Sequence, residues 1–144
     1  MRRKLIAGNW KMNTDLATAT ELAQGVAAGS AELSQVDLVV CPPAVYLHPV
    51  ATLLAGSPVD LGAQNMSAES NGAWTGEVSS SMLLDLGVRF VILGHSERRQ
   101  AMGETDAAVN VKTHRALAEG LTPIVCVGEL LEQREQGRTG EVIH

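Results

Sequence analysis

The sequence predicts an α/β fold built on a parallel sheet, and three observations support this prediction. Short apolar runs typical of buried strands begin near residues 5, 36, 59, 89 and 121, with helical patterns between most of them. Such spacing is typical of βαβ units, whose strands are parallel and whose crossovers are right-handed. The hydrophobic content of 45% with only 3% aromatic residues favours an interior packed with small aliphatic side chains.

The first half of the chain contains three predicted strands, at residues 5–8, 36–41 and 59–63. An Ala-rich helix is predicted over residues 16–28, with Thr14 or Asp15 in position to cap its first turn. A second helix is predicted over residues 44–55. It tolerates Pro49 only if its first turn falls there, because proline inside a helix breaks the hydrogen-bond ladder.

The second half continues the alternation of helices and strands. Strands are predicted at residues 89–93 and 121–127, and helices at residues 79–86, 106–118 and 129–136. Gly120 is placed to end the second of these helices. Residues 140–144 indicate a further helix that begins without a stop signal. No linker or low-complexity segment interrupts the pattern, so we expect one domain over residues 1–144.

Length and charge limit the classes of function. The 144 residues are within the usual range of a single domain. A net charge of −5 argues against nonspecific binding of nucleic acid or of an anionic membrane surface, but it leaves a small anionic substrate open. No apolar run is long enough for a signal peptide or a membrane span. We therefore expect a cytoplasmic protein with no nucleic-acid or membrane partner.

Cys41 and Cys126 lie at the ends of apolar strand patterns. Neither has the spacing of metal ligands or a nearby second cysteine, so we expect reduced, buried thiols. The sequence predicts no metal site and no cofactor.

The connection from Asn65 to Val78 is longer than the other predicted strand-to-helix loops. Such connections usually take about two to six residues. This loop contains Trp74 and Thr75, so a large apolar side chain stands among small residues. By its residues alone, the loop could either fold back over its own domain or reach a partner.

Two predicted strands end in residues that can do chemistry. The first strand runs into Asn9 and Lys11, and the fourth runs through Gly94 into His95 and Glu97. The carboxyl ends of parallel strands converge on one rim, so these side chains are candidates for a common site. Taken singly, an isolated lysine is usually a solvated surface group, and a loop histidine often has only a packing role.

These two strand ends are similar to those of triosephosphate isomerase. The similar segments are Ala7-Gly8-Asn9-Trp10-Lys11-Met12-Asn13, Cys41-Pro42-Pro43, Gly62-Ala63-Gln64-Asn65, Gly72-Ala73-Trp74-Thr75-Gly76-Glu77, Ile92-Leu93-Gly94-His95-Ser96-Glu97-Arg98-Arg99 and Pro123-Ile124-Val125-Cys126-Val127-Gly128-Glu129. The resemblance covers the whole chain in order. It implies the (β/α)₈ TIM-barrel fold, truncated here to roughly the first five βα units, because such a barrel typically needs about 250 residues.

The resemblance also implies an activity and a set of site residues. Triosephosphate isomerases interconvert glyceraldehyde 3-phosphate and dihydroxyacetone phosphate through an enediolate, in glycolysis and gluconeogenesis, without a cofactor. By this resemblance, His95 is a neutral electrophile at a helix N-terminus, where imidazolium is disfavoured. Lys11 stabilises the phosphate and the developing oxyanion. Asn9 positions Lys11 or contacts substrate. Glu97 is either a catalytic acid or a structural partner of Lys11 or Arg98.

The family resemblance further implies a homodimer, in which the loop with Trp74 and Thr75 reaches the neighbouring subunit. It places the glutamate base and the lid after a sixth strand, and the phosphate-binding amides after a seventh and an eighth. We therefore expect this chain alone to be inactive.

Three interpretations remain open at this point. The chain is the N-terminal portion of a triosephosphate isomerase, made by truncation, splitting or proteolysis. Alternatively, it is a non-catalytic half-barrel that self-associates through its open strand edges. As a third possibility, it is an open α/β domain that binds a phosphorylated ligand, which the absence of a Gly-x-Gly-x-x-Gly or P-loop motif makes weaker.

Overall fold

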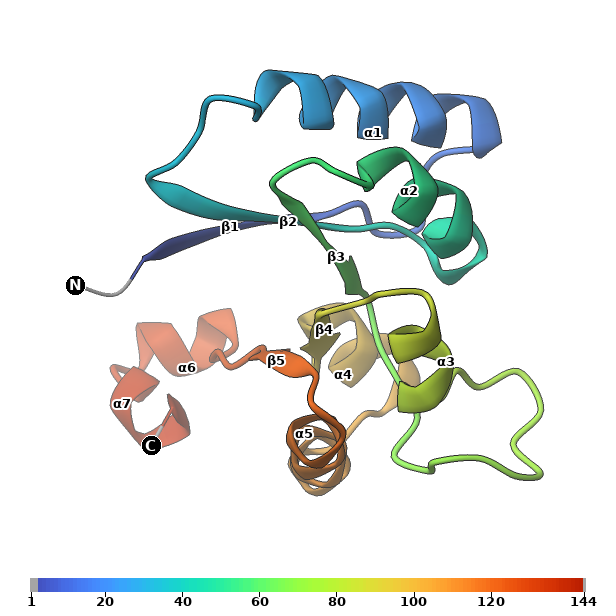
Figure 1. Ribbon diagram of the computed structural model, residues 1–144. Helices are drawn as coiled ribbons and strands as arrows, with labels where there is room; N and C mark the ends of the chain where they lie inside the picture. The colour runs from blue at the N-terminus through green and yellow to red at the C-terminus, as the bar shows by residue number, and fades with distance from the viewer. Residues whose placement is uncertain (1–2, 144) are drawn as a thin grey trace.

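The computed structural model describes residues 3–143 and shows five parallel strands in one curled sheet, a half-barrel (Figure 1). The strands lie in chain order, β1-β2-β3-β4-β5, and each neighbouring pair is parallel. Their bounds are β1 Lys4–Asn9, β2 Val36–Cys41, β3 Val59–Ala63, β4 Phe90–Leu93 and β5 Thr122–Val125. The predicted α/β fold with parallel strands is confirmed. Part of the segment predicted as a final helix, and the first two residues, lie outside the described residues.

Seven α-helices are assigned within residues 3–143. They are α1 Leu16–Gly29, α2 Leu47–Leu54, α3 Ser80–Asp85, α4 Ser96–Met102, α5 Asp106–Glu119, α6 Leu131–Glu135 and α7 Thr139–Ile143. Asp15 caps α1, because its carboxylate accepts the Thr18 N–H at 2.8 Å. Pro49 falls in the first turn of α2, as the sequence required. The predicted helix over 44–55 is divided into a 3₁₀ turn at Ala44–Tyr46 and α2, which begins at Leu47.

Two predicted boundaries in the C-terminal part were wrong. The fifth strand is shorter than the apolar run 121–127, because that run continues after pairing with β4 stops near Cys126. The helix predicted from residue 129 begins at Leu131. Glu129 precedes it, and its carboxylate accepts hydrogen bonds from Arg134 Nε at 2.7 Å and from Thr139 Oγ1 at 3.1 Å. It therefore connects α6 to α7.

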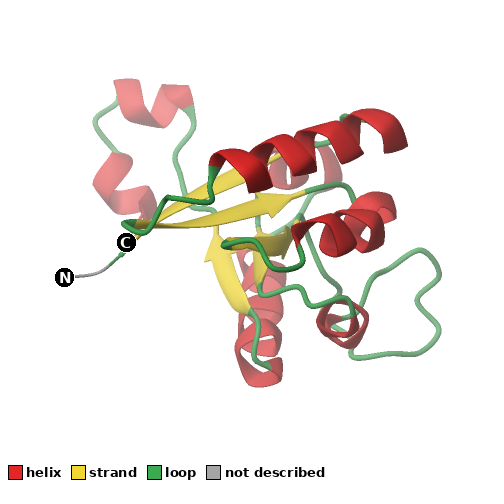
Figure 2. Cartoon of the chain, turned by 45° about the horizontal axis from the view of Figure 1, so that its top comes forward, coloured by secondary structure: helices red, strands yellow, loops and turns green. Residues whose placement is uncertain are grey.

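The core lies mainly between the outer face of the sheet and the helices that cover it (Figure 2). Leu47 and Val50 of α2 and Val109 of α5 pack in the same cluster as Val91 and Leu93 of β4. A smaller cluster occupies the inner face of the curl, with Val39, Cys41 and Ile92 at its centre and Phe90, Ile124 and Cys126 at its margin. Apolar burial on both faces is typical of parallel strands.

The two cysteines differ in their surroundings. Cys41 is fully buried, and burial raises the pKa of its thiol to about 12. Cys126 is only partly buried, so the expectation of two buried thiols was wrong for this residue. Burial still raises the pKa of the Cys126 thiol, against the opposing charge of Arg99. Both cysteines are free thiols.

The outermost strands of the sheet have exposed apolar side chains. Among the described residues, β1 pairs with β2 and β5 pairs with β4. Ile6 of β1 is 56% exposed, and Leu5, Val125 and the adjoining Val127 are also exposed. Both edges therefore present apolar surface together with unpaired backbone groups.

In the described part of the chain, no helix is both long and apolar enough to cross a bilayer. Residues 3–143 also contain no group of three or more His, Cys, Asp and Glu side chains arranged to hold a metal ion.

Candidate active site

The structure brings the four predicted site residues to one pocket at the carboxyl ends of the strands. Asn9 ends β1 and Lys11 follows it, whereas His95 and Glu97 follow β4. All four line a pocket of about 340 Å³. Across this pocket the Lys11 Nζ atom lies 2.6 Å from Glu97 Oε1. The convergence expected from the strand order therefore occurs between strands that are not neighbours in the sheet.

The backbone of Lys11 adopts an unusual conformation. Its φ is +55°, in the left-handed region that lysine rarely occupies. Two side chains hold both of its backbone polar groups, one from the same strand end and one from beyond β3. Its N–H donates to Asn9 Oδ1 at 2.9 Å, and its carbonyl accepts from Gln64 Nε2 at 2.8 Å. Of the two roles considered for Asn9, this contact supports the positioning of Lys11.

Gln64 is a site residue for which sequence analysis assigned no role. It follows β3, and its Nε2 also donates to the Cys41 carbonyl at 2.8 Å. Its place in the Gly62-Ala63-Gln64-Asn65 segment was the available signal, but the segment alone does not show what the amide contacts.

His95 is the N-cap residue of α4. Its Nδ1 accepts a hydrogen bond from the Glu97 N–H at 3.3 Å, and Glu97 Oε2 lies 3.4 Å from the same nitrogen. Because a backbone amide always carries its proton, we interpret Nδ1 as the acceptor. That leaves the ring proton on Nε2, as in a neutral imidazole. The ring is partly buried, and its hydrogen bond to the first turn of α4 restrains its orientation.

Glu97 is a partner of Lys11. The hydrogen bond from the Lys11 ammonium holds the pKa of the Glu97 carboxyl below its usual value, and this outweighs the opposing effect of desolvation. A carboxyl that exchanges protons near neutral pH needs a raised pKa. The environment of Glu97 shifts its pKa in the opposite direction, so its carboxylate is suited to orienting the lysine. The pair is half exposed, and solvent screens it.

A second polar cluster is formed by side chains from α4, from α5, from the short connection between them and from the segment that follows β3. Glu104 accepts a short hydrogen bond from the Lys112 ammonium, and Arg98 Nε lies 3.4 Å from the same carboxylate oxygen. Lys112 Nζ also donates to Asn65 Oδ1 at 3.0 Å. The Glu104 side chain is only 5% exposed. Its burial favours a raised pKa, but the hydrogen bond and charge of Lys112, with the charge of Arg98, lower the pKa of Glu104 below its usual value.

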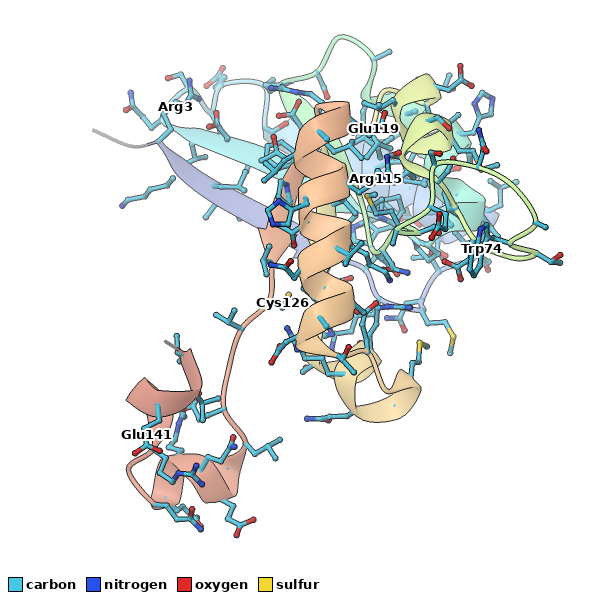
Figure 3. All side chains as sticks on the ribbon, turned by 90° about the horizontal axis from the view of Figure 1, so that it is seen from below. Arg3, Trp74, Arg115, Glu119, Cys126 and Glu141 are labelled. Atoms are coloured by element: carbon cyan, nitrogen blue, oxygen red, sulfur yellow. The ribbon has the colours of Figure 1, made fainter. Side chains whose placement is uncertain are left out.

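The 65–78 loop extends away from the body of the domain between β3 and α3 (Figure 1). Its two ends are joined by a hydrogen bond from the Ser67 N–H to the Val78 carbonyl at 2.8 Å. Trp74 lies on the projecting part and is 55% exposed (Figure 3). Thr75 is exposed next to it. Of the two arrangements that the residues left open, the loop therefore projects.

Comparison with known proteins agrees with the geometry of this site. The family model for triosephosphate isomerase matches residues 4–144. A triosephosphate isomerase of Rhodopirellula baltica is 59% identical over 142 residues, which cover 99% of this chain and 56% of the relative. The triosephosphate isomerase of Chloroflexus aurantiacus is 54% identical over 143 residues, with 99% and 57% covered. The chain thus spans little more than half the length of these curated relatives. On this sequence match, the chain belongs to the triosephosphate isomerase family.

Proposed function

We propose that this chain provides the electrophilic half of a triosephosphate isomerase active site. The reaction is the interconversion of glyceraldehyde 3-phosphate and dihydroxyacetone phosphate, by proton transfer through an enediolate. One observation supports this most directly. The Lys11 ammonium and the His95 ring, whose Nδ1 accepts the Glu97 N–H, follow the first and fourth strands and line the same pocket.

His95 and Lys11 have complementary roles in this proposal. A neutral imidazole donates from Nε2 to a substrate oxygen and exchanges a proton with it as the enediolate forms. The Lys11 ammonium supplies positive charge to the substrate phosphate and to the developing oxyanion. Asn9 and Glu97 hold the backbone and the side chain of Lys11.

The proton-abstracting base is expected from outside this chain. A glutamate base and a closing lid come from the family resemblance, and the geometry described above does not supply them. Glu97 lines the pocket, but its pairing with Lys11 lowers its pKa and makes it a poor base near neutral pH. General-base catalysis contributes about 10²–10⁴-fold. We therefore propose that the 144-residue chain alone does not turn over triose phosphates.

The experiment that tests this proposal is complementation. The purified chain is assayed alone and after mixing with a second chain, made from the remaining part of the Rhodopirellula baltica relative. We expect background rates alone and isomerase activity after mixing. Steady turnover by the chain alone would contradict its inactivity. A stable mixed complex without activity would contradict the proposed function.

Besides binding of a phosphorylated triose, we propose that copies of this chain associate with one another. The projecting 65–78 loop with Trp74 and Thr75 supports a homodimer contact, as the family resemblance implies. The exposed apolar edges at β1 and β5 specifically favour the second candidate, a non-catalytic half-barrel that associates through its edges. We also propose a cytoplasmic protein with no nucleic-acid or membrane partner, which the net charge of −5 supports.

A further inference from the structure

Gln64 links three segments that converge at the candidate site. It lies just beyond β3, and its side-chain nitrogen donates to the carbonyl of Lys11, beyond β1, and to the carbonyl of Cys41, at the end of β2. A glutamine amide has two N–H groups, so one side chain satisfies both acceptors. The amide therefore fixes where the backbone turns after β1 relative to the two next strands.

The residue held in this way has a backbone that needs support. A non-glycine residue at positive φ costs on the order of 1–3 kcal/mol, and it persists only where its surroundings hold it. The Lys11 N–H is held by Asn9, which belongs to the same strand end and moves with it. The Lys11 carbonyl is held by Gln64, which lies 53 residues away, just beyond a different strand. Gln64 thus provides the long-range support for this conformation.

The direction of the Lys11 side chain depends on that backbone. A residue that leaves the left-handed region changes the direction of its Cα–Cβ bond relative to the strands, and the ammonium at the end of the side chain moves furthest. The contact of 2.6 Å between Lys11 Nζ and Glu97 is made with Lys11 in the conformation that Gln64 supports. Gln64 itself makes no hydrogen bond to Glu97 or His95 in the described residues, so its effect on that side of the pocket has to pass through Lys11.

We propose that Gln64 is a positioning residue for Lys11: it holds the Lys11 carbonyl at the end of β2 and so keeps the ammonium beside Glu97 in the pocket shared with His95. The inference rests on the proposed function only for the role of the Lys11 ammonium, which is to stabilise negative charge on the substrate. The placement of the ammonium is a property of this chain, and it can be measured without isomerase activity.

Titration of the Glu97 carboxyl reports this placement, because the hydrogen bond from Lys11 is the main cause of its lowered pKa. We suggest following the Glu97 carboxyl carbon by NMR as a function of pH in the 144-residue chain and in Gln64→Met, which keeps the length of the side chain and removes its donors. We expect the Glu97 pKa to rise toward its usual value in the variant. Gln24→Met, at an exposed position of α1, is the matched control and should leave Glu97 unchanged.

A double variant separates an effect through Lys11 from a general disturbance. Lys11→Met should raise the pKa of Glu97 by removing its partner altogether. Adding Gln64→Met to Lys11→Met should then change the titration no further. A folded Gln64→Met chain with an unchanged Glu97 titration would overturn the proposal, and so would an equal additional shift in the double variant.

One measurement needs no substitution and remains informative if Gln64→Met does not fold. In the unmodified chain, the side-chain amide protons of Gln64 should exchange with solvent more slowly than those of Gln24, because both are engaged by carbonyls. Equal exchange rates at the two glutamines would show that Gln64 does not hold Lys11. A stable mixed complex without activity would contradict the proposed function while leaving both of these results intact.

Discussion

The Lys11 ammonium lies 2.6 Å from the Glu97 carboxylate, although 86 residues separate the two along the chain. They follow β1 and β4, which are separated in the sheet by β2 and β3. In a flat sheet those strands would be about 14 Å apart, three strand spacings. The curl of the sheet therefore brings the two side chains within hydrogen-bond distance. The candidate site is a product of the curvature as much as of the two sequence motifs.

His95→Gln tests the proposed proton exchange in the complemented complex. Glutamine can still donate a hydrogen bond to a substrate oxygen, but it cannot pass a proton between two oxygens. We expect kcat to fall by about 10²–10⁴-fold, the typical contribution of acid–base catalysis, with a smaller change in KM. His114→Gln, at an exposed position of α5, is the control and should leave steady-state kinetics unchanged. Equal activity of the two variants would remove His95 from the reaction.

Lys11→Met tests the need for positive charge in the pocket. The substitution keeps most of the side-chain length and removes the ammonium. We expect KM to rise and kcat to fall together, because the charge is proposed to act on both the phosphate and the oxyanion. Loss of an electrostatic stabiliser typically lowers kcat by about 10²–10³-fold. Lys4→Met, on the exposed start of β1, provides the charge-matched control. An effect of similar size at Lys4 would point to the net charge of the protein instead.

Glu104→Ala tests the buried polar cluster that Glu104 forms with Lys112 and Arg98. The substitution leaves Lys112 and Arg98 without their carboxylate, and Lys112 is largely buried. Removing one member of a buried ion pair typically lowers the free energy of unfolding by about 3–5 kcal/mol. Glu119→Ala breaks an exposed pair with Arg115 on α5 (Figure 3). This substitution should lower the free energy of unfolding by only about 0.3–0.5 kcal/mol. Urea denaturation at neutral pH compares the two variants.

The effect of Glu104→Ala should also depend on pH. The pKa of Glu104 is lowered in the folded protein, so its contribution to stability is present above the usual glutamate value of 4.5. It is lost as pH falls through the lower folded-state value. The difference in unfolding free energy between the unmodified chain and Glu104→Ala should therefore shrink below pH 4.5. A difference that stays constant into strong acid would show that Glu104 acts by packing alone.

The sequence predicted strand bounds best where a proline or a polar residue ends the apolar run. The second and third strands were predicted with their observed bounds, because Pro42 stops one apolar run and Gln64 the other. The fifth strand was predicted too long, since an apolar run continues after the pairing ends. Strand pairing depends on the neighbouring strand, which a local pattern does not describe.

The same distinction applies to the candidate site. The strand-end motifs predicted which residues gather at the rim, because convergence there follows from the order of parallel strands. The contacts that give these residues their properties were not predictable from the motifs. Gln64 reaches Lys11 across 53 positions, and Lys112 reaches Asn65 across 47. Such contacts depend on how far the sheet curls and on how α5 packs against it.

Gly62→Ala tests the packing of the inner face of the sheet. A Cβ atom at this position would lie 2.5 Å from Cys41 Sγ and 3.0 Å from Val39 Cγ2, and both of these side chains are buried. We expect the free energy of unfolding to fall by about 1–3 kcal/mol, as is usual when a well-packed core is overfilled.

Gly25→Ala is the matched control for that substitution. Gly25 lies inside α1, and its Cβ would meet no atom within 4 Å. Alanine is there expected to raise the free energy of unfolding by about 0.4–1 kcal/mol, because it restricts the unfolded chain. Unfolding in urea should thus separate the two glycine variants in opposite directions. A neutral Gly62→Ala would mean that Cys41 and Val39 can move apart at little cost.

Self-association is expected of the 144-residue chain, and its two proposed surfaces can be separated by substitution. Light scattering across a dilution series should show dimers or larger assemblies that dissociate on dilution. If β1 and β5 pair between copies, Ile6→Lys with Val125→Lys should shift the chain toward monomer, because charged side chains on a strand edge oppose pairing. If the 65–78 loop makes the contact, Trp74→Ser should have that effect and the edge variant should not. A compact monomer at micromolar concentration, unfolding cooperatively, would contradict both, because exposed apolar edges and a projecting tryptophan would then be tolerated without a partner.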